Sequence, residues 1–297
     1  MNFEVKNILI PTDFSPTGLL AIDHAVFMAR LFKADLFLLH VIEISETTYR
    51  IYNPAVSVPV PKEIETIVQK KLEEQAEILR KHYSINVTTI CSHGKTTTEI
   101  LEAVNENKID LVVMGTHGVS GFNEYFMGSN AYKTVTTCPC PVITIQTQAK
   151  KLGFADILLP VDDSTHSRQK VNAAITLAKK YASKIHILGL DSSTETSDAK
   201  KFAVKVESVE KLVKKAGLTC NVKIINDDSL ATAAMKYAKK IKADLIVVMT
   251  GHESNLTGIF LGPFAKQIVN HSRIPVMSIK PDHGHYNFVS LAAASPF

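Results

Sequence analysis

Short, continuous apolar runs alternate with amphipathic stretches along the whole chain. In the first half the runs lie near residues 6–12, 35–42, 85–91, 109–115 and 141–146. Their length and their richness in Ile, Leu and Val are typical of parallel strands buried on both faces. The stretches between them carry helical stripes of apolar residues, such as Ile22-Ala25-Val26-Ala29 and Ile64-Val68-Leu72. The pattern predicts strands joined by helical crossovers in a doubly wound α/β sheet.

The second half of the chain repeats the first. Residues 7–15 (NILIPTDFS) return 149 positions later as residues 156–164 (DILLPVDDS). Residues 110–113 and 140–143 return only 134 positions later, as residues 244–247 and 274–277. The second copy therefore lacks about 15 residues, which we place between its second strand and the next helix. The predicted fold class is two tandem copies of a doubly wound, five-stranded parallel sheet with helices on both faces.

The length agrees with this repeat, because 297 residues exceed the ~100–200 of one typical domain. We expect a first domain over residues 1–148, a second over 153–281 and a C-terminal tail over 282–297. Hydrophobic residues make up 45% of the chain and charged residues 21%, which excludes a largely disordered protein.

Charge and cysteine usage narrow the cellular setting. A net charge of +4 is too weak and dispersed to indicate a nucleic-acid partner. No apolar run approaches the ~18–20 residues of a membrane span, and the first residues do not read as a secretory signal, so we expect no membrane insertion. Four cysteines do not form a disulfide framework in a chain this long, and we expect structural thiols and a cytoplasmic protein.

A glycine pattern follows the predicted fourth strand. Gly115, Gly118, Gly128 and Ser129 have the spacing G-x2-G-x9-G-S, which begins where the strand ends and closes where a helix should start. In open α/β sheets ligands bind beyond the carboxyl ends of the strands, and glycines and a helix N-terminus suit a phosphate. The plainer interpretation is that the glycines only form turns and Ser129 only caps a helix.

Further motifs accompany the glycines: residues 10–15 (IPTDFS), His40-Val41, residues 114–118 (MGTHG) and residues 140–142 (CPV). With them, the sequence resembles the universal stress protein family in its tandem two-domain form, from about Lys6 to Ile279. The resemblance implies an ATP site and leaves room for Mg²⁺ or Mn²⁺ on the phosphates, which Asp13 would help to hold. In it Pro11, Thr12 and Asp13 lie near adenine and ribose, and Val41 and Met114 line the adenine pocket. The resemblance assigns ribose and phosphates to Gly115, Gly118, Gly128, Ser129 and Asn130.

The second copy departs from the pattern. Aligned without a gap, Gly115 becomes Met249, Gly118 becomes His252 and Ser129 becomes Pro263, while only Gly128 keeps its counterpart, Gly262. An alignment shifted by one residue puts Thr250 and Glu253 at the first two glycines instead. In either alignment side chains replace two glycines, and Pro263 lacks an N–H donor. We expect the second copy to bind no triphosphate, or to bind it much more weakly.

Three functions remain open at this point. The first is an ATP-binding, non-catalytic regulator of the stress response, in which nucleotide orders residues 119–127 for an unknown protein partner. The second is a slow ATP hydrolase or autophosphorylating switch with Ser129 or a threonine as acceptor, although no catalytic set is visible. The third is a nucleotide-free interaction scaffold. The resemblance also implies that the two copies pair through their last strands, and it leaves further dimerisation open.

Two other local motifs are weaker evidence for a binding site. Gly94-Lys95-Thr96 resembles the end of a phosphate-binding P-loop, but Thr89 stands where that motif needs its first glycine. We read this segment as a strand-to-helix loop with Thr96 or Thr97 as the N-cap. His283 and His285 lie in the tail and are not expected to form a metal site.

Overall fold

The computed structural model describes residues 3–43, 61–116, 127–163, 168–191, 196–227, 229–251 and 261–281. The elements of the first copy, in chain order, are β1 (Asn7–Pro11), α1 (Pro16–Phe32), β2 (Asp35–Ile42), α3 (Lys62–Tyr83), β3 (Val87–His93), α4 (Thr96–Glu106), β4 (Leu111–Gly115), α5 (Ser129–Thr137) and β5 (Val142–Ile145). Strands and helices alternate as the apolar pattern predicts.

The second copy has the same order of strands and crossover helices. Its elements are β6 (Asp156–Val161), α6 (Lys170–Tyr181), β7 (Lys184–Asp191), α7 (Thr196–Lys215), β8 (Cys220–Asn226), α8 (Leu230–Ile241), β9 (Leu245–Met249), α9 (Pro263–His271) and β10 (Val276–Ile279). Nineteen residues separate β2 from α3, whereas four separate β7 from α7. The 15-residue difference therefore lies where the repeat offsets predict it.

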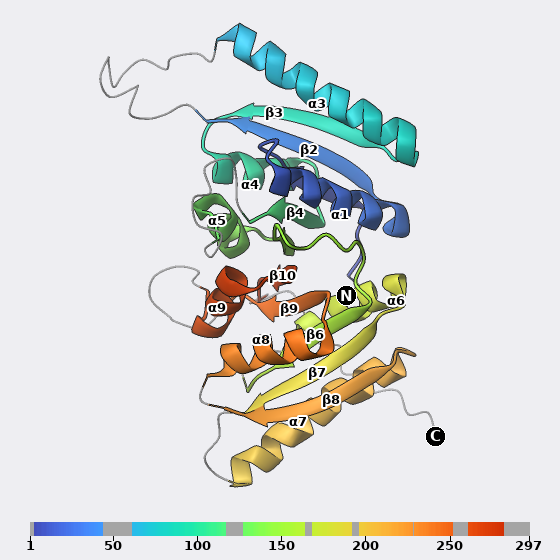
Figure 1. The fold of residues 1–297 in the computed structure, drawn as a ribbon, viewed down its shortest axis with the longest axis vertical. Helices are drawn as coiled ribbons and strands as arrows, with labels where there is room; N and C mark the ends of the chain where they lie inside the picture. Colours follow the sequence, from blue (N-terminus) through green and yellow to red (C-terminus); the bar gives the residue numbers. More distant parts are fainter. Residues whose placement is uncertain are drawn as a thin grey trace, which may run out of the picture.

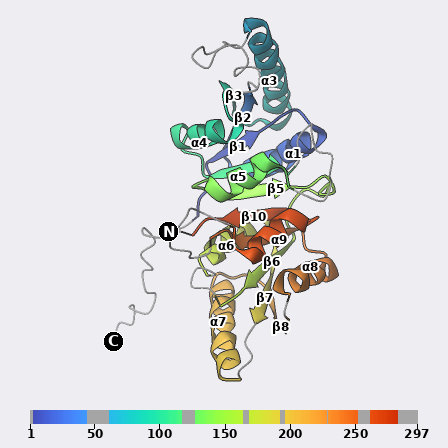
Figure 2. The same cartoon turned by 90° about the vertical axis from the view of Figure 1, so that its left-hand side faces the viewer.

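All these strands belong to one sheet with the order β3-β2-β1-β4-β5-β10-β9-β6-β7-β8 (Figure 1). Within each copy neighbouring strands are parallel. The copies meet where β5 and β10 pair antiparallel, with Ile143 opposite Met277 and Thr144 opposite Val276. The two copies thus lie one beyond the other along the long axis of the molecule, as Figure 2 also shows. The predicted fold class is confirmed, with the two sheets fused into one.

Both faces of the sheet are covered. One apolar cluster gathers residues of α1, α3, α6 and α7, and a second gathers residues of α4, α5, α8 and α9. The predicted stripe on α1 is fully buried, but on α3 only Leu72 is, and Ile64 is 46% exposed. The 22 residues of α3 span ~33 Å, whereas the seven of β3 span ~23 Å, so the first turns of the helix extend past the sheet.

The segment that joins β5 to β6 forms a second connection between the copies. Phe154 of this segment is 1% exposed, and its ring stacks on His24 of α1 and contacts Tyr181 of α6, with centroid distances of 6.0 and 5.1 Å. The Nε2 of His24 lies 2.8 Å from the carbonyl oxygen of Ala149. Burial lowers the pKa of His24 and raises that of Tyr181, so both rings stay uncharged at neutral pH. Gly153 precedes Phe154 at φ 86°, a conformation that favours glycine.

We expect Phe154→Ala to lower the free energy of unfolding by about 3–5 kcal/mol, because it removes a buried ring between two helices. Leu152→Ala is the matched control, since Leu152 is in the same segment but 42% exposed. Chemical denaturation of both variants measures the difference. Equal losses in the two variants would mean that the aromatic contacts do not join the copies.

Candidate functional site

The strand order of the first copy places a switch point between β1 and β4. After β1 the chain continues to β2 and β3 on one side, and β4 leads to β5 on the other. The loops that leave β1 and β4 therefore diverge at the carboxyl edge of the sheet, where open α/β sheets bind ligands. Pro11, Thr12 and Asp13 leave β1 there, beside Met114 and Gly115 at the end of β4.

The loop after β1 is held by its own hydrogen bonds. Ser15 caps α1 by accepting a hydrogen bond from the Gly18 amide at 3.1 Å. The Asp13 carboxylate accepts one from the Ser15 amide at 3.0 Å. Phe14 adopts φ 62° and stacks on His40 of β2 at a centroid distance of 4.8 Å. These contacts fix the position of the Asp13 carboxylate at the switch point.

His40 connects this loop to β2. Its Nδ1 lies 2.8 Å from the carbonyl oxygen of Thr12, and the Lys71 ammonium lies 4.1 Å from the centroid of the Phe14 ring on the same loop. Val41 follows His40 in β2 and is half-buried. His40 thus supports the loop that presents Asp13.

The glycines have packing roles of their own. A Cβ on Gly115 would lie 2.9 Å from the Thr17 methyl carbon and 3.1 Å from the Thr17 carbonyl carbon, so glycine is required for the close approach of α1. A Cβ on Gly128 would lie 3.1 Å from the Thr116 carbonyl oxygen, which accepts the Gly128 N–H at 2.8 Å. Both glycines therefore bring backbone segments together, whatever the site binds.

Helix α5 begins at the same edge. Gly128 is its N-cap and has no side chain to cap it, and Ser129 and Asn130 form the first turn, exposed and half-buried respectively. A helix start of this kind offers backbone N–H groups and the positive end of the helix dipole to an anion. Gly118 and residues 119–126 lie outside the described residues, so their predicted role remains a prediction.

Glu43, just after β2, is a neighbour of the site that the sequence reasoning missed. Its carboxylate accepts hydrogen bonds from the Thr96 amide, at 3.1 Å, and from the Thr96 hydroxyl. The bonds from Thr96, with smaller contributions from Asn130 and Lys133 of α5, lower the pKa of Glu43. The expectation that Thr96 or Thr97 caps α4 is wrong: the N-cap is Lys95, which makes no side-chain capping bond, and Glu43, the residue after β2, supplies the oxygen that accepts the Thr96 amide.

The second copy shows which alignment is correct. Strand β9 and helix α9 match β4 and α5 at a constant offset of 134, and Gly262 caps α9 at φ −56° and ψ 154°, close to the −59° and 150° of Gly128. Met249 therefore occupies the Gly115 position and Pro263 the Ser129 position. His252 and Glu253 lie outside the described residues.

Lys170 fills the corresponding space in the second copy. It stands in α6 where Ala21 stands in α1, is 2% exposed, and lines a cavity of about 40 Å³ with Asp162, Met249 and Gly262. Burial lowers the pKa of Lys170 to about 8, against the opposing effect of the Asp162 carboxylate. This volume is close to the ~30 Å³ share of liquid volume of one water molecule.

The cysteines, possible metal ligands and long helices of the described residues add no further site. All four cysteines are free thiols, and the Sγ atoms of Cys138 and Cys140 lie 3.4 Å apart. Within the described ranges no group of three or more His, Cys, Asp and Glu side chains gathers to hold a metal. None of the described helices is long and apolar enough to cross a membrane.

The fold and the switch-point loops define a tandem, doubly wound α/β protein with its candidate site at the carboxyl edge of the first sheet half. The chain belongs to the universal stress protein family, whose model matches residues 4–146 and again 153–280. The family resemblance of the sequence is thus confirmed.

Curated relatives match about one copy of the chain. Universal stress protein MJ0531 of Methanocaldococcus jannaschii is 31% identical over 152 residues, which cover 49% of this chain and 85% of the relative. Universal stress protein YxiE of Bacillus subtilis is 30% identical over 149 residues, which cover 48% and 99%. A solved universal stress protein from Archaeoglobus fulgidus covers 94% of this chain and 99% of its own, with a TM-score of 0.75 at 19% identity. That structure has the same fold over both copies.

We expect a pH-dependent contribution of Lys170 to stability. Its pKa in the folded chain, about 8, lies below the ordinary 10.5, so between these values the unfolded chain binds more protons. The free energy of unfolding of the wild type, minus that of Lys170→Met, therefore rises as the pH increases from about 8 toward 10.5. Urea unfolding across this range measures it, with Lys179→Met, an exposed position of the same helix, as the control. If the difference in the free energy of unfolding between wild type and variant does not change with pH for either variant, Lys170 is not a buried ammonium with a lowered pKa.

Proposed function

We propose that the first copy binds ATP and that the protein is a non-catalytic, nucleotide-dependent regulator in the cytoplasmic stress response. The observation that carries this proposal is the contrast between the two copies. In the first copy Ala21, Gly115 and Ser129 stand at the switch point, whereas Lys170, Met249 and Pro263 stand at the equivalent positions of the second. Membership of the universal stress protein family supports it.

In this proposal Asp13 accepts hydrogen bonds from the ribose hydroxyls, because its carboxylate is held at the end of β1 by the Ser15 amide. Val41 and Met114 contact the adenine, and the first turn of α5 holds the phosphates. The carboxylates of Asp13 and Glu43 are oxygen donors of the kind Mg²⁺ and Mn²⁺ prefer. Since no protein-only metal cluster is present among the described residues, the cation would be held chiefly on the phosphates.

Ser129→Pro tests the phosphate part of the site. Proline is favoured at the first position of a helix, Gly128 already has the extended backbone that proline requires before it, and Pro263 begins α9 in the same way. The fold should therefore persist while one N–H donor and a hydroxyl are lost. We expect ATP affinity, measured by calorimetry, to fall about tenfold or more.

Pro263→Ser is the matched control in the second copy. It restores an N–H group and a hydroxyl, but Lys170 and Met249 still fill the space, so we expect unchanged affinity and no second binding event. Nucleotide released by heating the purified wild type identifies the natural ligand. A wild type that neither carries nor binds ATP, or a folded Ser129→Pro variant that binds as tightly as the wild type, would contradict the proposal.

The exposed hydroxyl of Ser129 keeps the autophosphorylating switch as a second candidate. In that reaction the hydroxyl oxygen bonds to the γ-phosphorus of ATP, the bond to the β-phosphate oxygen breaks, ADP leaves, and the hydroxyl proton passes to solvent. Ser129→Ala keeps the backbone N–H and removes the acceptor. Incorporation of labelled phosphate that Ser129→Ala abolishes, with ATP binding intact, would favour the switch over the non-catalytic regulator.

A further inference from the structure

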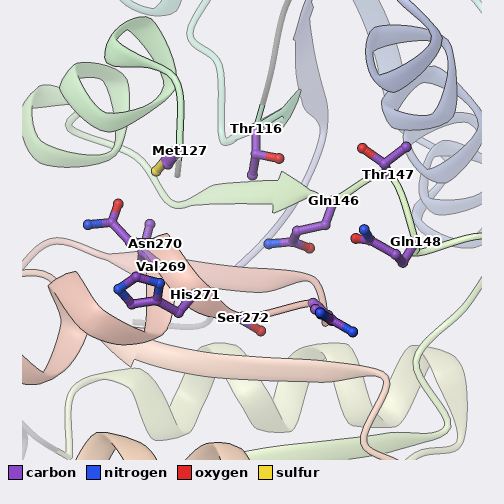
Figure 3. Close-up of a pocket in the computed structure, with 10 residues that line it drawn as sticks. Thr116, Met127, Gln146, Thr147, Gln148, Val269, Asn270, His271 and Ser272 are labelled. Atoms are coloured by element: carbon purple, nitrogen blue, oxygen red, sulfur yellow. The ribbon is translucent and has the colours of Figure 1, made fainter. Parts of the chain in front are cut away.

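A polar cavity lies at the seam between the two copies (Figure 3). Its volume is about 160 Å³, and both copies contribute to its lining. Thr116, Gln146 and Thr147 come from the end of β4 and the segment after β5, whereas Asn270, His271 and Arg273 come from the C-terminal end of α9 and the residue beyond its C-cap. The cavity thus depends on the pairing of β5 with β10.

Gln146 is the feature that indicates a ligand. The residue is only 5% exposed, yet neither its amide oxygen nor its amide nitrogen has a hydrogen-bond partner in the described part of the chain. Buried polar groups are nearly always paired, and each unpaired one is costly. Figure 3 shows the amide extending from the end of β5 toward the part of α9 that carries Asn270 and His271. A polar molecule in the cavity would supply the missing partners.

Charge and size describe that molecule. Among the described lining residues Arg273 contributes a permanent positive charge, and none is a carboxylate. The amide of Asn270 adds a donor to the lining, whereas the Thr116 hydroxyl already donates to the Ile145 carbonyl oxygen at 3.4 Å and the Thr147 hydroxyl pairs with that of Thr17 at 3.5 Å. The volume is several times the ~30 Å³ share of one water, but below the ~300 Å³ of the smaller drug-sized pockets. A small oxyanion that keeps a hydroxyl, such as hydrogen phosphate, fits the charge and the size and can pair both atoms of the Gln146 amide.

The two-fold-related side of the seam lacks this chemistry. The 134-residue offset relates Gln146 to Lys280, His271 to Thr137 and Arg273 to Pro139. The side chains that characterise the cavity are therefore not repeated on the other side and do not follow from the repeated fold.

Thr116 separates the cavity from the switch point of the first copy. Its amide donates a hydrogen bond to the carbonyl oxygen of Ile145 at 3.0 Å, and its carbonyl oxygen accepts the N–H of Gly128, the N-cap of α5. Its side chain lines the cavity. A ligand in the seam would consequently contact the residue that positions the start of α5.

We propose that this seam cavity binds a phosphate-sized oxyanion through Arg273 and Gln146. The site is separate from the proposed ATP site and does not require it. The anion neutralises the guanidinium, accepts a hydrogen bond from the Gln146 Nε2, donates one from its own P–OH group to the Gln146 Oε1, and joins the two copies.

Calorimetric titration of the full chain with inorganic phosphate tests this proposal. Arg273→Ala should weaken binding about tenfold or more, because it removes a charged hydrogen-bond donor. Gln146→Leu should weaken binding similarly without lowering the melting temperature, since it also removes two unpaired buried groups. Lys266→Ala is the control, because it removes an exposed positive charge from α9 outside the cavity and should change affinity less than twofold.

The NMR signals of the Gln146 side-chain amide and the variant Ser129→Pro show where phosphate binds. Phosphate should shift the side-chain amide resonances of Gln146, which are assigned by their loss in Gln146→Leu. Binding that Ser129→Pro abolishes and Gln146→Leu preserves would locate phosphate at α5 and overturn the proposal. A folded wild type that shows neither heat nor shift would overturn it as well, leaving a cavity that holds only water. Failure of ATP binding alone leaves these phosphate measurements unaffected.

Discussion

The antiparallel pairing of β5 with β10 is the interaction on which the rest of the molecule depends. Each copy on its own would end in a strand with an unpaired edge, and such an edge invites pairing with another chain. Here the two edges satisfy each other, and Thr144 adds a hydroxyl bond to the Val276 carbonyl oxygen at 3.3 Å. Ile143 and Met277, opposite each other, are fully buried. The sheet, the Phe154 contact and the seam cavity all follow from this pairing.

Within this shared frame, a few positions separate the two copies chemically. Ala21 of α1 and Lys170 of α6 occupy equivalent positions. The alanine side chain is small and neutral, whereas the lysine places an ammonium group at the switch point of the second copy. A buried ammonium is expensive, and its lowered pKa reports that cost. The Lys170 side chain and Asp162 both line the small cavity at the second switch point. The strands and caps are preserved, so the two copies keep one fold although these side chains differ.

Much of this could be predicted from the sequence, because repeats and apolar runs are local signals. The strands, the offset change and the position of the missing residues all agree with the structure. Contacts between distant segments could not be predicted. Glu43 caps a helix 53 residues away, Lys170 faces a site whose motif it does not belong to, and Ile64 is exposed because its helix is longer than the sheet beneath. Each depends on packing geometry, which periodicity does not describe.

Fusion into one chain explains why the seam can be asymmetric. In a dimer of identical subunits a two-fold axis repeats every seam feature, so any residue added on one side appears on the other. Here Gln146 faces the cavity while its counterpart Lys280 lies near Cys138, and Arg273 has only Pro139 as its counterpart. Each side has therefore changed independently under the single constraint that β5 and β10 stay paired. A tandem chain thus permits a single-sided seam site next to one switch point, which a symmetric dimer cannot form.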